Sequence, residues 1–453
     1  MNADKIIQKP GERSPLLPRS LAPLHTIILL AILVLAFALR VWNIANLRMW
    51  GDEGFSVFSA HRDLYAITFE GKDVDPHPPL YYYLLHFWLP LAGSSEFSIR
   101  FLSILFGTAT VALMYALGKR LCDARVGLLA SALIAIAPFA IHYSQEVRMY
   151  ALVIFLGALA TWFFARMIEK ETRARWLGFW LAMFLAQYTL YQTAFLFVAQ
   201  GLTLLPLLKN SFTFVARWLA ASISIVILFL PWLALHSASA YTDVKGVAGD
   251  TVPMDVGTFL ARGFAGLILD PPLPLANALP LAAMFFGLIV IGLAIARGAR
   301  EAKFSDALLI WFVVIPLLAM YQLYILLPLY RGRLFALALV PLLILIARAF
   351  DVIARRVRWW SAPIAIALIA AMLFGLNHYY FRYQRYSAVV DDYIPAIRAL
   401  EKIAQPGDIV LFHAYWQEGY FLSHYAGARL TYGGLEKQSD WYGPAPNPLE
   451  RDS

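Results

Sequence analysis

Long apolar runs, separated by short polar loops, constrain this chain more than any other feature of its sequence. A helix that crosses the hydrocarbon core of a bilayer needs about 20 mostly apolar residues. Hydrophobic residues make up 60% of the 453 residues and charged residues only 15%, whereas soluble domains carry roughly 25% charged residues. These values exclude a soluble globular domain and predict an all-α polytopic membrane protein.

We expect about eleven transmembrane helices. The stretch Trp176–Leu208 is long for one span and short for two, and the polar residues near Gln187 and Gln192 predict a turn within it, so its span count stays open. The apolar windows begin near Leu24, Ser98, Val126, Met149, Trp176, Tyr191, Trp218, Asn277, Ala307, Leu334 and Ser361.

Lys and Arg residues gather in alternate loops. Cytoplasmic loops carry an excess of these residues, so we expect a plasma or inner membrane protein with a cytoplasmic N-terminus, residues 1–23, and an extracytoplasmic C-terminal region, residues 381–453. Because the cations form short clusters between apolar runs, the net charge of +8 indicates topology rather than nucleic-acid binding. The cation-rich loops contain Lys119, Arg120, Arg125, Arg166, Lys170, Arg173, Arg175, Lys209, Arg217, Arg297, Arg300, Lys303, Arg348, Arg355, Arg356 and Arg358.

Residues 24–380 are expected to form one transmembrane domain with two long outer loops, residues 43–97 and 235–276. Hydropathy falls beyond this domain. There, Ile394–Ile403 predicts a short amphipathic helix, and Asp408–Phe412 predicts a buried strand after a Pro-Gly-Asp turn. We therefore expect a small α/β extracytoplasmic segment at the C-terminus.

An adjacent acid pair, Asp52 and Glu53, follows the first apolar run within Trp50-Gly51-Asp52-Glu53-Gly54. A carboxylate at a membrane face can act as the general base that takes a proton from a hydroxyl group. Its neighbour can bind an acceptor or a metal. A solvated loop pair, or Asp52 as the N-cap of a following helix, is the alternative explanation.

About twenty residues later, two prolines lead from His77 into an aromatic run that includes Tyr81 and Tyr82. The prolines favour an extended entry, and the aromatic residues predict an interfacial helix. His77, Tyr81 and Tyr82 are therefore candidates for a substrate loop. A plain interfacial anchor would have the same pattern.

Two further outer loops contain polar residues of a kind that binds phosphate. One is a short loop with Gln145, Glu146 and Arg148, and the other contains Arg331 and Arg333. Arginine binds phosphate through two parallel hydrogen bonds. We expect Gln145 and Glu146 in the substrate loop set and the three arginines as phosphate ligands; interfacial cations that snorkel to the surface are the alternative.

Metal dependence is not determined by the sequence. Asp52, Glu53, His77 and Glu146 could form an oxygen-rich site for a divalent metal, but no spacing among them compels one. The single cysteine, Cys122, excludes an intrachain disulfide and a zinc-finger pattern.

Together these motifs resemble the family 39 glycosyltransferases, the protein O-mannosyltransferase-like and aminoarabinose-transferase-like group of the C-type membrane glycosyltransferase superfamily. The resemblance runs over nearly the whole chain. Its most specific parts are Trp50–Phe55, Pro76–Tyr82, Ser95–Arg100 and Ser144–Tyr150.

The resemblance implies a polyprenyl-phosphate-linked sugar donor and hexosyl or pentosyl transfer on the extracytoplasmic side, to a protein, lipid or glycan acceptor. It also implies that Asp52 matches the catalytic acid of the family, with Glu53 assisting. Arg333 corresponds to the arginine of the family's Arg-Tyr-Leu-Leu segment, but Leu334 follows it in place of tyrosine. Whether Arg331 or Arg333 contacts the phosphate therefore stays open.

Two other functions compete with this hypothesis. A transporter or lipid flippase usually has charges or broken helices at mid-span, often repeated in two halves, whereas here the ionisable groups gather at one face and no repeat is detectable. A lipid-linked glycan ligase would have its key residues in a large later loop, whereas the densest polar set is in the first.

The cation asymmetry makes a testable prediction of topology. Tags placed within residues 43–97 or after Ser387 should be extracytoplasmic, and tags near Arg120, Arg173, Arg300 and Arg355 should be cytoplasmic. Accessibility labelling of tagged proteins in intact cells measures this. If a tag in the first loop were cytoplasmic, the acid pair would lie on the cytoplasmic side of the membrane, away from the expected site of transfer.

Overall fold

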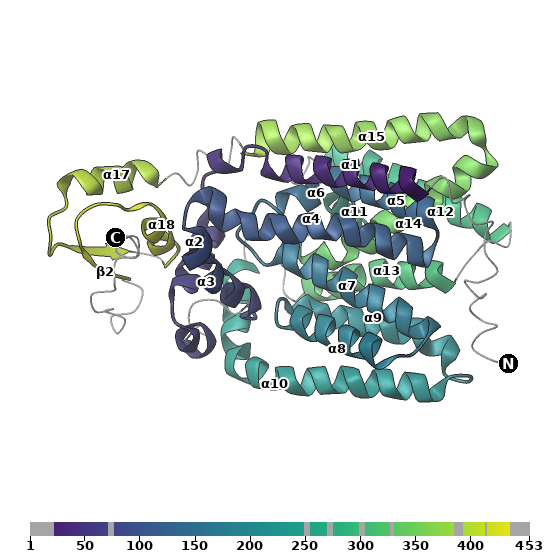
Figure 1. Cartoon of the computed structure of the whole chain (residues 1–453), viewed down its shortest axis with the longest axis horizontal. Helices are drawn as coiled ribbons and strands as arrows, with labels where there is room; N and C mark the ends of the chain where they lie inside the picture. The colour runs from purple at the N-terminus through teal and green to yellow at the C-terminus, as the bar shows by residue number, and fades with distance from the viewer. Residues whose placement is uncertain are drawn as a thin grey trace.

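The computed structural model of the chain describes residues 22–70, 77–248, 254–269, 275–298, 304–326, 330–384, 393–412 and 415–434. Most of the described residues form helices that lie side by side along the long axis of the molecule (Figure 1). The long helices and their shorter partners are α1 (Ala22–Val41), α4 (Glu96–Leu121), α5 (Ala124–Ile136), α7 (Tyr150–Glu169), α8 (Arg173–Gln187), α9 (Ala194–Leu204), α10 (Phe212–Ala248), α11 (Val256–Leu269), α12 (Leu275–Gly298), α13 (Phe304–Leu326), α14 (Leu339–Arg356) and α15 (Ser361–His378).

Within the described residues, 8 helical segments are long and apolar enough to cross a membrane. The other three predicted windows coincide with the shorter helices α5, α8 and α9. The doubtful stretch Trp176–Leu208 forms two helices, α8 and α9, joined through a short turn at Tyr191–Thr193. The predicted all-α polytopic membrane fold is confirmed.

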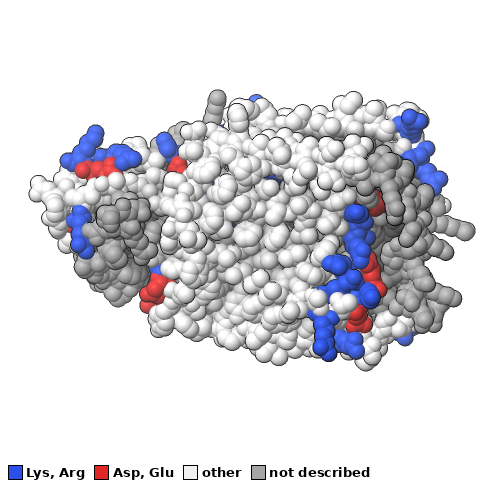
Figure 2. All heavy atoms as spheres, in the orientation of Figure 1, with Lys and Arg blue, Asp and Glu red and all other residues white. Residues whose placement is uncertain are grey.

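Charged residues gather at the two ends of the visible face, and the band between them is almost uncharged (Figure 2). Large apolar side chains such as Val34, Ile227 and Ile366 are exposed on the helices of this band, at 70%, 57% and 67% of their surface. Exposed apolar side chains of this size are stable when they face lipid. The chain is therefore a multi-pass membrane protein.

Helix α14 is the central helix of the bundle. The span that contains it is 94% buried, compared with 17% for the peripheral first span. A 3₁₀ segment, η8 (Gly332–Ala338), leads into α14. Because η8 begins the most enclosed span, residues at its start are held in place by the core of the protein.

Arg40, inside the first span, caps the C-terminal end of a neighbouring helix with its side chain. Its buried guanidinium donates to the carbonyls of Ile134 and Ala135, the last turn of α5, and to the hydroxyl of Ser144. These carbonyls have no partner within their own helix, and a cation there also complements the helix dipole. Arg40 therefore caps the C-terminal end of α5 inside the bundle, just before α6 (Pro138–His142) begins.

A layer of short elements covers one end of the bundle (Figure 1). It contains α2 (Gly51–His61), η4 (Ala66–Glu70) and α3 (Leu80–Ala92), all from the predicted first outer loop. The segment of residues 235–276, which we expected to be the fourth outer loop, contains the end of α10 and the apolar helix α11, whose residues Leu267–Leu269 are buried.

Beyond this layer lies the small C-terminal α/β segment, as predicted (Figure 1). The prediction of a buried strand within it was wrong, because Ile409 and Leu411 are 57% and 44% exposed. Its elements are α17 (Ile394–Ile403), β1 (Ile409–Phe412), α18 (Tyr415–His424) and β2 (Thr431–Gly434). The two strands pair in parallel, with Ile409 opposite Thr431. Parallel strands need a crossover connection, and α18 provides it.

Candidate active site

Helix α2 presents the acid pair at its first turn. Negative side chains are favourable there because the free backbone N–H groups give a helix N-terminus a partial positive charge. The capping contact is made by Glu53, whose carboxylate accepts from the N–H of Trp50 at 3.3 Å. The alternative explanation of Asp52 as N-cap is therefore not what the structure shows, since Trp50 occupies that position.

Glu53 is a buried structural anchor. Only 1% of its surface is exposed. Arg100 of α4 donates to its two carboxylate oxygens from Nε at 2.9 Å and Nη2 at 2.6 Å, and the N–H of Val147 donates to Oε1 at 2.9 Å. With Trp50 included, four donors face this carboxylate, which joins α2, α4 and the loop before α7.

Arg100 extends this anchor to the segment that precedes α2. Its guanidinium also donates to the carbonyls of Leu47 at 2.9 Å and Arg48 at 3.1 Å. No role was predicted for Arg100 from the sequence. Its signal was a charged residue only a few positions inside a predicted span, which usually marks a buried partner or a functional site.

Asp52, unlike its neighbour, is partly exposed. Its carboxyl is 31% exposed, and its Oδ2 accepts from Nη1 of Arg333 at 2.6 Å. The guanidinium of Arg333 lies 5.5 Å from the ring centre of Trp50 and 5.7 Å from that of Tyr150. Two aromatic faces therefore hold the arginine that meets Asp52, through cation–π contacts.

Arg148 binds the same turn of α2 through hydrogen bonds. It is 3% exposed, and its Nη1 donates to the backbone carbonyl of Asp52 at 3.2 Å, to Oγ of Ser56 at 3.2 Å and to the hydroxyl of Tyr82 at 3.4 Å. Burial acts to raise the pKa of Asp52, but the positive charges of Arg148 and Arg333 outweigh it. The pKa of Asp52 is consequently lowered, and its carboxyl is ionised at neutral pH.

The other predicted substrate residues have varied surroundings. His77 lies near enough to Asp52 to contribute to its low pKa. Tyr81 is a core residue whose hydroxyl pairs with Ser103 at 3.0 Å. Gln145 donates to the carbonyls of Arg40 and Trp42 at 2.8 and 2.9 Å, so it holds the end of the first span.

Between the two candidate arginines that follow α13, the structure brings only one to the acid pair. Arg333 contacts Asp52, whereas Arg331 is exposed. Arg331 is the extended residue before the 3₁₀ segment η8, whereas Arg333 lies within its first turn.

The four predicted metal candidates do not form a metal site. Within the described ranges no group of three or more His, Cys, Asp or Glu residues converges. Glu53 is occupied by Arg100, and Glu146 pairs with His142 at 3.0 Å. Asp52 is faced by two arginines, and two cations beside one carboxylate oppose the binding of a third.

A polar cavity of about 30 Å³ opens beside the Glu53–Arg100 pair. Glu146 lines it with a buried oxygen, Oε2, that has no hydrogen-bond partner among the described residues. The space is sufficient for one water molecule. Its walls include Arg48, Trp50, His142, Gln145, Tyr379, Tyr383 and Gln384.

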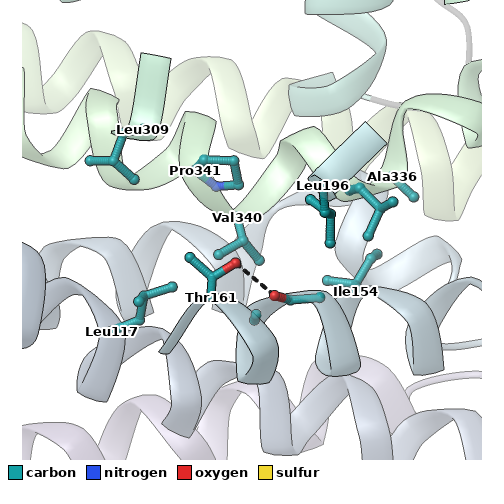
Figure 3. A pocket seen from close by; sticks show the side chains of 11 residues that line it. Leu117, Ile154, Thr161, Leu196, Leu309, Ala336, Val340 and Pro341 are labelled. Carbon is teal, nitrogen blue, oxygen red and sulfur yellow. Dashed lines mark hydrogen bonds between the residues drawn. The ribbon is translucent and has the colours of Figure 1, made fainter. Parts of the chain in front are cut away.

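A second cavity, of about 10 Å³, lies deeper in the bundle (Figure 3). Its walls are apolar apart from Thr161, whose hydroxyl donates to the carbonyl of Gly157 at 2.7 Å. It begins at Ile154, about 6 Å along α7 from Tyr150 at 1.5 Å per residue. This volume is at the lower limit for one water, so the cavity is a packing gap and has no room for an isoprenoid chain.

The buried pair makes a prediction of stability. Arg100→Met would leave the Glu53 carboxylate buried without its main partner, and breaking such a pair costs about 3–5 kcal/mol. Denaturant titration in mild detergent should show this loss of unfolding free energy. Arg331→Met, at an exposed position, is the matched control; equal unfolding of the two variants would refute the anchoring role.

Comparisons with known proteins agree with this architecture. Residues 76–235 match the family model described as dolichyl-phosphate-mannose-protein mannosyltransferase. No curated protein matches the chain in sequence. Among solved structures, ArnT from Cupriavidus metallidurans bound to undecaprenyl phosphate has a TM-score of 0.60 at 12% identity, over 92% of this chain and 87% of that chain.

Two archaeal structures are also similar. AglB from Archaeoglobus fulgidus, in complex with an inhibitory peptide and a dolichol-phosphate, has a TM-score of 0.58 at 12% identity, over 94% of this chain and 60% of that chain. The oligosaccharyltransferase of the same organism tethered with an acceptor peptide has a TM-score of 0.56 at 14% identity, over 88% and 63%. This chain therefore spans less than two thirds of these archaeal chains. The fold is that of the C-type membrane glycosyltransferases, and the predicted resemblance to the protein O-mannosyltransferase-like group is supported by the family model over residues 76–235.

Proposed function

We propose that this protein is a membrane glycosyltransferase that moves a sugar from a polyprenyl-phosphate-linked donor to an acceptor hydroxyl on the extracytoplasmic side. The observation that carries the proposal is the Asp52–Arg333 pair, 2.6 Å apart and partly exposed at one end of a transmembrane bundle. The similar structures support the donor class, because ArnT was solved with undecaprenyl phosphate and AglB with a dolichol-phosphate.

The position of the pair suits a lipid-linked donor. Each CH₂ group of a lipid tail contributes about 0.8 kcal/mol to membrane binding, so a polyprenyl tail does not leave the bilayer on its own. The reacting groups must then lie at the membrane surface. Asp52 lies on α2, in the layer that covers the end of the bundle (Figure 1).

Asp52 acts as the base in this proposal. Its carboxylate takes the proton of the acceptor hydroxyl while the hydroxyl oxygen bonds to the anomeric carbon of the sugar. The bond between that carbon and the phosphate oxygen breaks, and its electron pair stays on the phosphate. Arg333 and Arg148 stabilise the negative charge that develops there.

The ion pair also suggests how Asp52 becomes a stronger base. A carboxylate whose pKa is lowered by two arginines is a weak base. When the donor phosphate binds, it competes for the guanidinium of Arg333. The pKa of Asp52 then rises, so the base gains strength only when the donor is present.

Glu53 has a positioning role in the proposal and does not react. Its four donors leave it no lone pair directed at substrate. The proposed donor site therefore comprises Asp52, Arg148 and Arg333, with Trp50 and Tyr150 holding Arg333 and with Tyr82 and His77 at its edge.

The acid makes the first functional prediction. Asp52→Asn keeps the size and polarity of the side chain and removes the base, so turnover should fall by about 10²–10⁴-fold. The assay is transfer from radiolabelled polyprenyl-phosphate sugars in membranes, at equal protein levels. Near-normal transfer by Asp52→Asn would show that the carboxylate serves only to hold Arg333.

The second functional prediction concerns the arginines. Arg148→Lys and Arg333→Lys keep the charge but lose the planar two-bond fork. Donor affinity should fall about tenfold, since a charge-assisted hydrogen bond contributes about 1.5–3 kcal/mol. Arg331→Lys is the matched control and should bind donor normally. Equal donor titrations for all three variants would leave the proposed donor site without a phosphate ligand.

A further inference from the structure

The C-terminal segment touches the proposed catalytic helix by direct backbone contact. A Cβ atom placed on Gly419 of α18 would lie 1.7 Å from the carbonyl oxygen of Gly54 and 3.0 Å from its Cα. Real Cβ contacts are never so short, so only glycine at position 419 permits this approach. Gly54 lies two residues after Asp52, in the first turn of α2.

Two further interactions lie near the two ends of α18. Near its start, Glu418 is 4% exposed and lies close enough to Arg62, at the end of α2, for the charges to interact. At its end, Nε2 of His424 is 3.4 Å from Oε1 of Glu96, the first residue of α4. Helix α18 is therefore attached to both ends of α2 and to the bundle behind it.

The face of α2 that α18 covers is completely enclosed. Every residue from Ser56 to Ala60 is buried, as is Gly54. An 11-residue helix is marginal on its own in water, since isolated helices need about 12–15 residues. Its stability and its position must come from the elements packed against it, and Figure 1 shows α18 beside it, on the side away from the bundle.

We infer that α18 is a positioning element for the proposed catalytic carboxylate: seated on Gly54 through Gly419, it fixes the first turn of α2 so that Asp52 meets Arg333. This inference rests on the proposed function for Asp52. It gives the C-terminal segment a role in turnover through its contact with the helix that carries Asp52.

The test compares two glycine-to-alanine variants. Gly419→Ala forces α18 away from α2, whereas a Cβ on Gly287 of α12 meets nothing within 4 Å, so Gly287→Ala is the matched control. Displacing a reacting group by about 1 Å can cost about 10²-fold in rate. We expect kcat to fall about 10- to 100-fold in Gly419→Ala only, with a smaller change in KM for the donor, because the side chains of Arg148 and Arg333 come from segments other than α2.

A second measurement does not depend on activity. Hydrogen exchange of the amides of Phe55–Ala60 should be faster in Gly419→Ala than in the wild-type protein and unchanged in Gly287→Ala. Unchanged exchange in α2, or an unchanged kcat in Gly419→Ala, would overturn the inference. If the wild-type protein transfers no sugar while α2 exchange still rises in Gly419→Ala, the proposed function fails and the attachment of α18 to α2 stands.

The same contact should depend on pH. Burial raises the pKa of Glu418 to about 7, although Arg62 acts to lower it. Tyr432 of β2 also lies near Glu418, and Arg62 in turn pairs with Glu70. A raised pKa means that the docked state holds the proton more tightly, so docking weakens as pH rises from the ordinary glutamate value through about 7.

Glu418→Gln keeps the side chain neutral at every pH. The exchange of α2 amides, corrected for intrinsic rates, should be faster at about pH 8 than at about pH 6 in the wild-type protein, and this difference should be smaller in Glu418→Gln. A pH dependence that persists unchanged in Glu418→Gln would remove Glu418 from the contact that holds α18.

Discussion

The buried pair of Glu53 and Arg100 is the interaction on which the rest of the site depends. One carboxylate receives two bonds from Arg100 and one from each of two backbone N–H groups. Three segments far apart in the sequence meet there: the turn before α2, the first turns of α4 and the loop before α7. A buried charge is tolerated only when it is paired in this way, so these segments have one relative arrangement. That arrangement directs Asp52, the residue before Glu53 on α2, toward Arg333.

The site therefore divides two adjacent acids between two tasks. Glu53 joins the segments of the site. Asp52 is partly exposed, and it accepts a hydrogen bond from Arg333 on its carboxylate and another from Arg148 on its backbone carbonyl. In the proposed reaction, Arg333 has one partner before the donor binds and another afterwards. Before the donor binds, Arg333 keeps Asp52 ionised; afterwards the phosphate takes over the guanidinium. The account needs no metal at Asp52, whose two cationic neighbours already oppose one.

Hydropathy alone predicted most of the fold, because a span in lipid must be apolar and helical along its whole length. Trp176–Leu208 is an example, since its polar turn divided α8 from α9 as expected. The roles of the individual site residues were harder to predict from the sequence. Asp52 and Glu53 are neighbours with the same chemistry, and only the approach of Arg100 distinguishes them. Likewise, the 3₁₀ turn at Gly332 separates Arg331 from Arg333, and the contact of Gly419 with Gly54 leaves no pattern in a single sequence.

In the proposed mechanism, Asp52 and the donor phosphate compete for Arg333. Binding of polyprenyl phosphate without a sugar, to purified wild-type protein and to Asp52→Asn, tests it most directly. Because the substitution removes the competing carboxylate, the account predicts that Asp52→Asn binds polyprenyl phosphate as tightly as the wild-type protein or more tightly. Binding about tenfold weaker in Asp52→Asn would contradict the account, since it would show that the carboxylate helps to hold the phosphate.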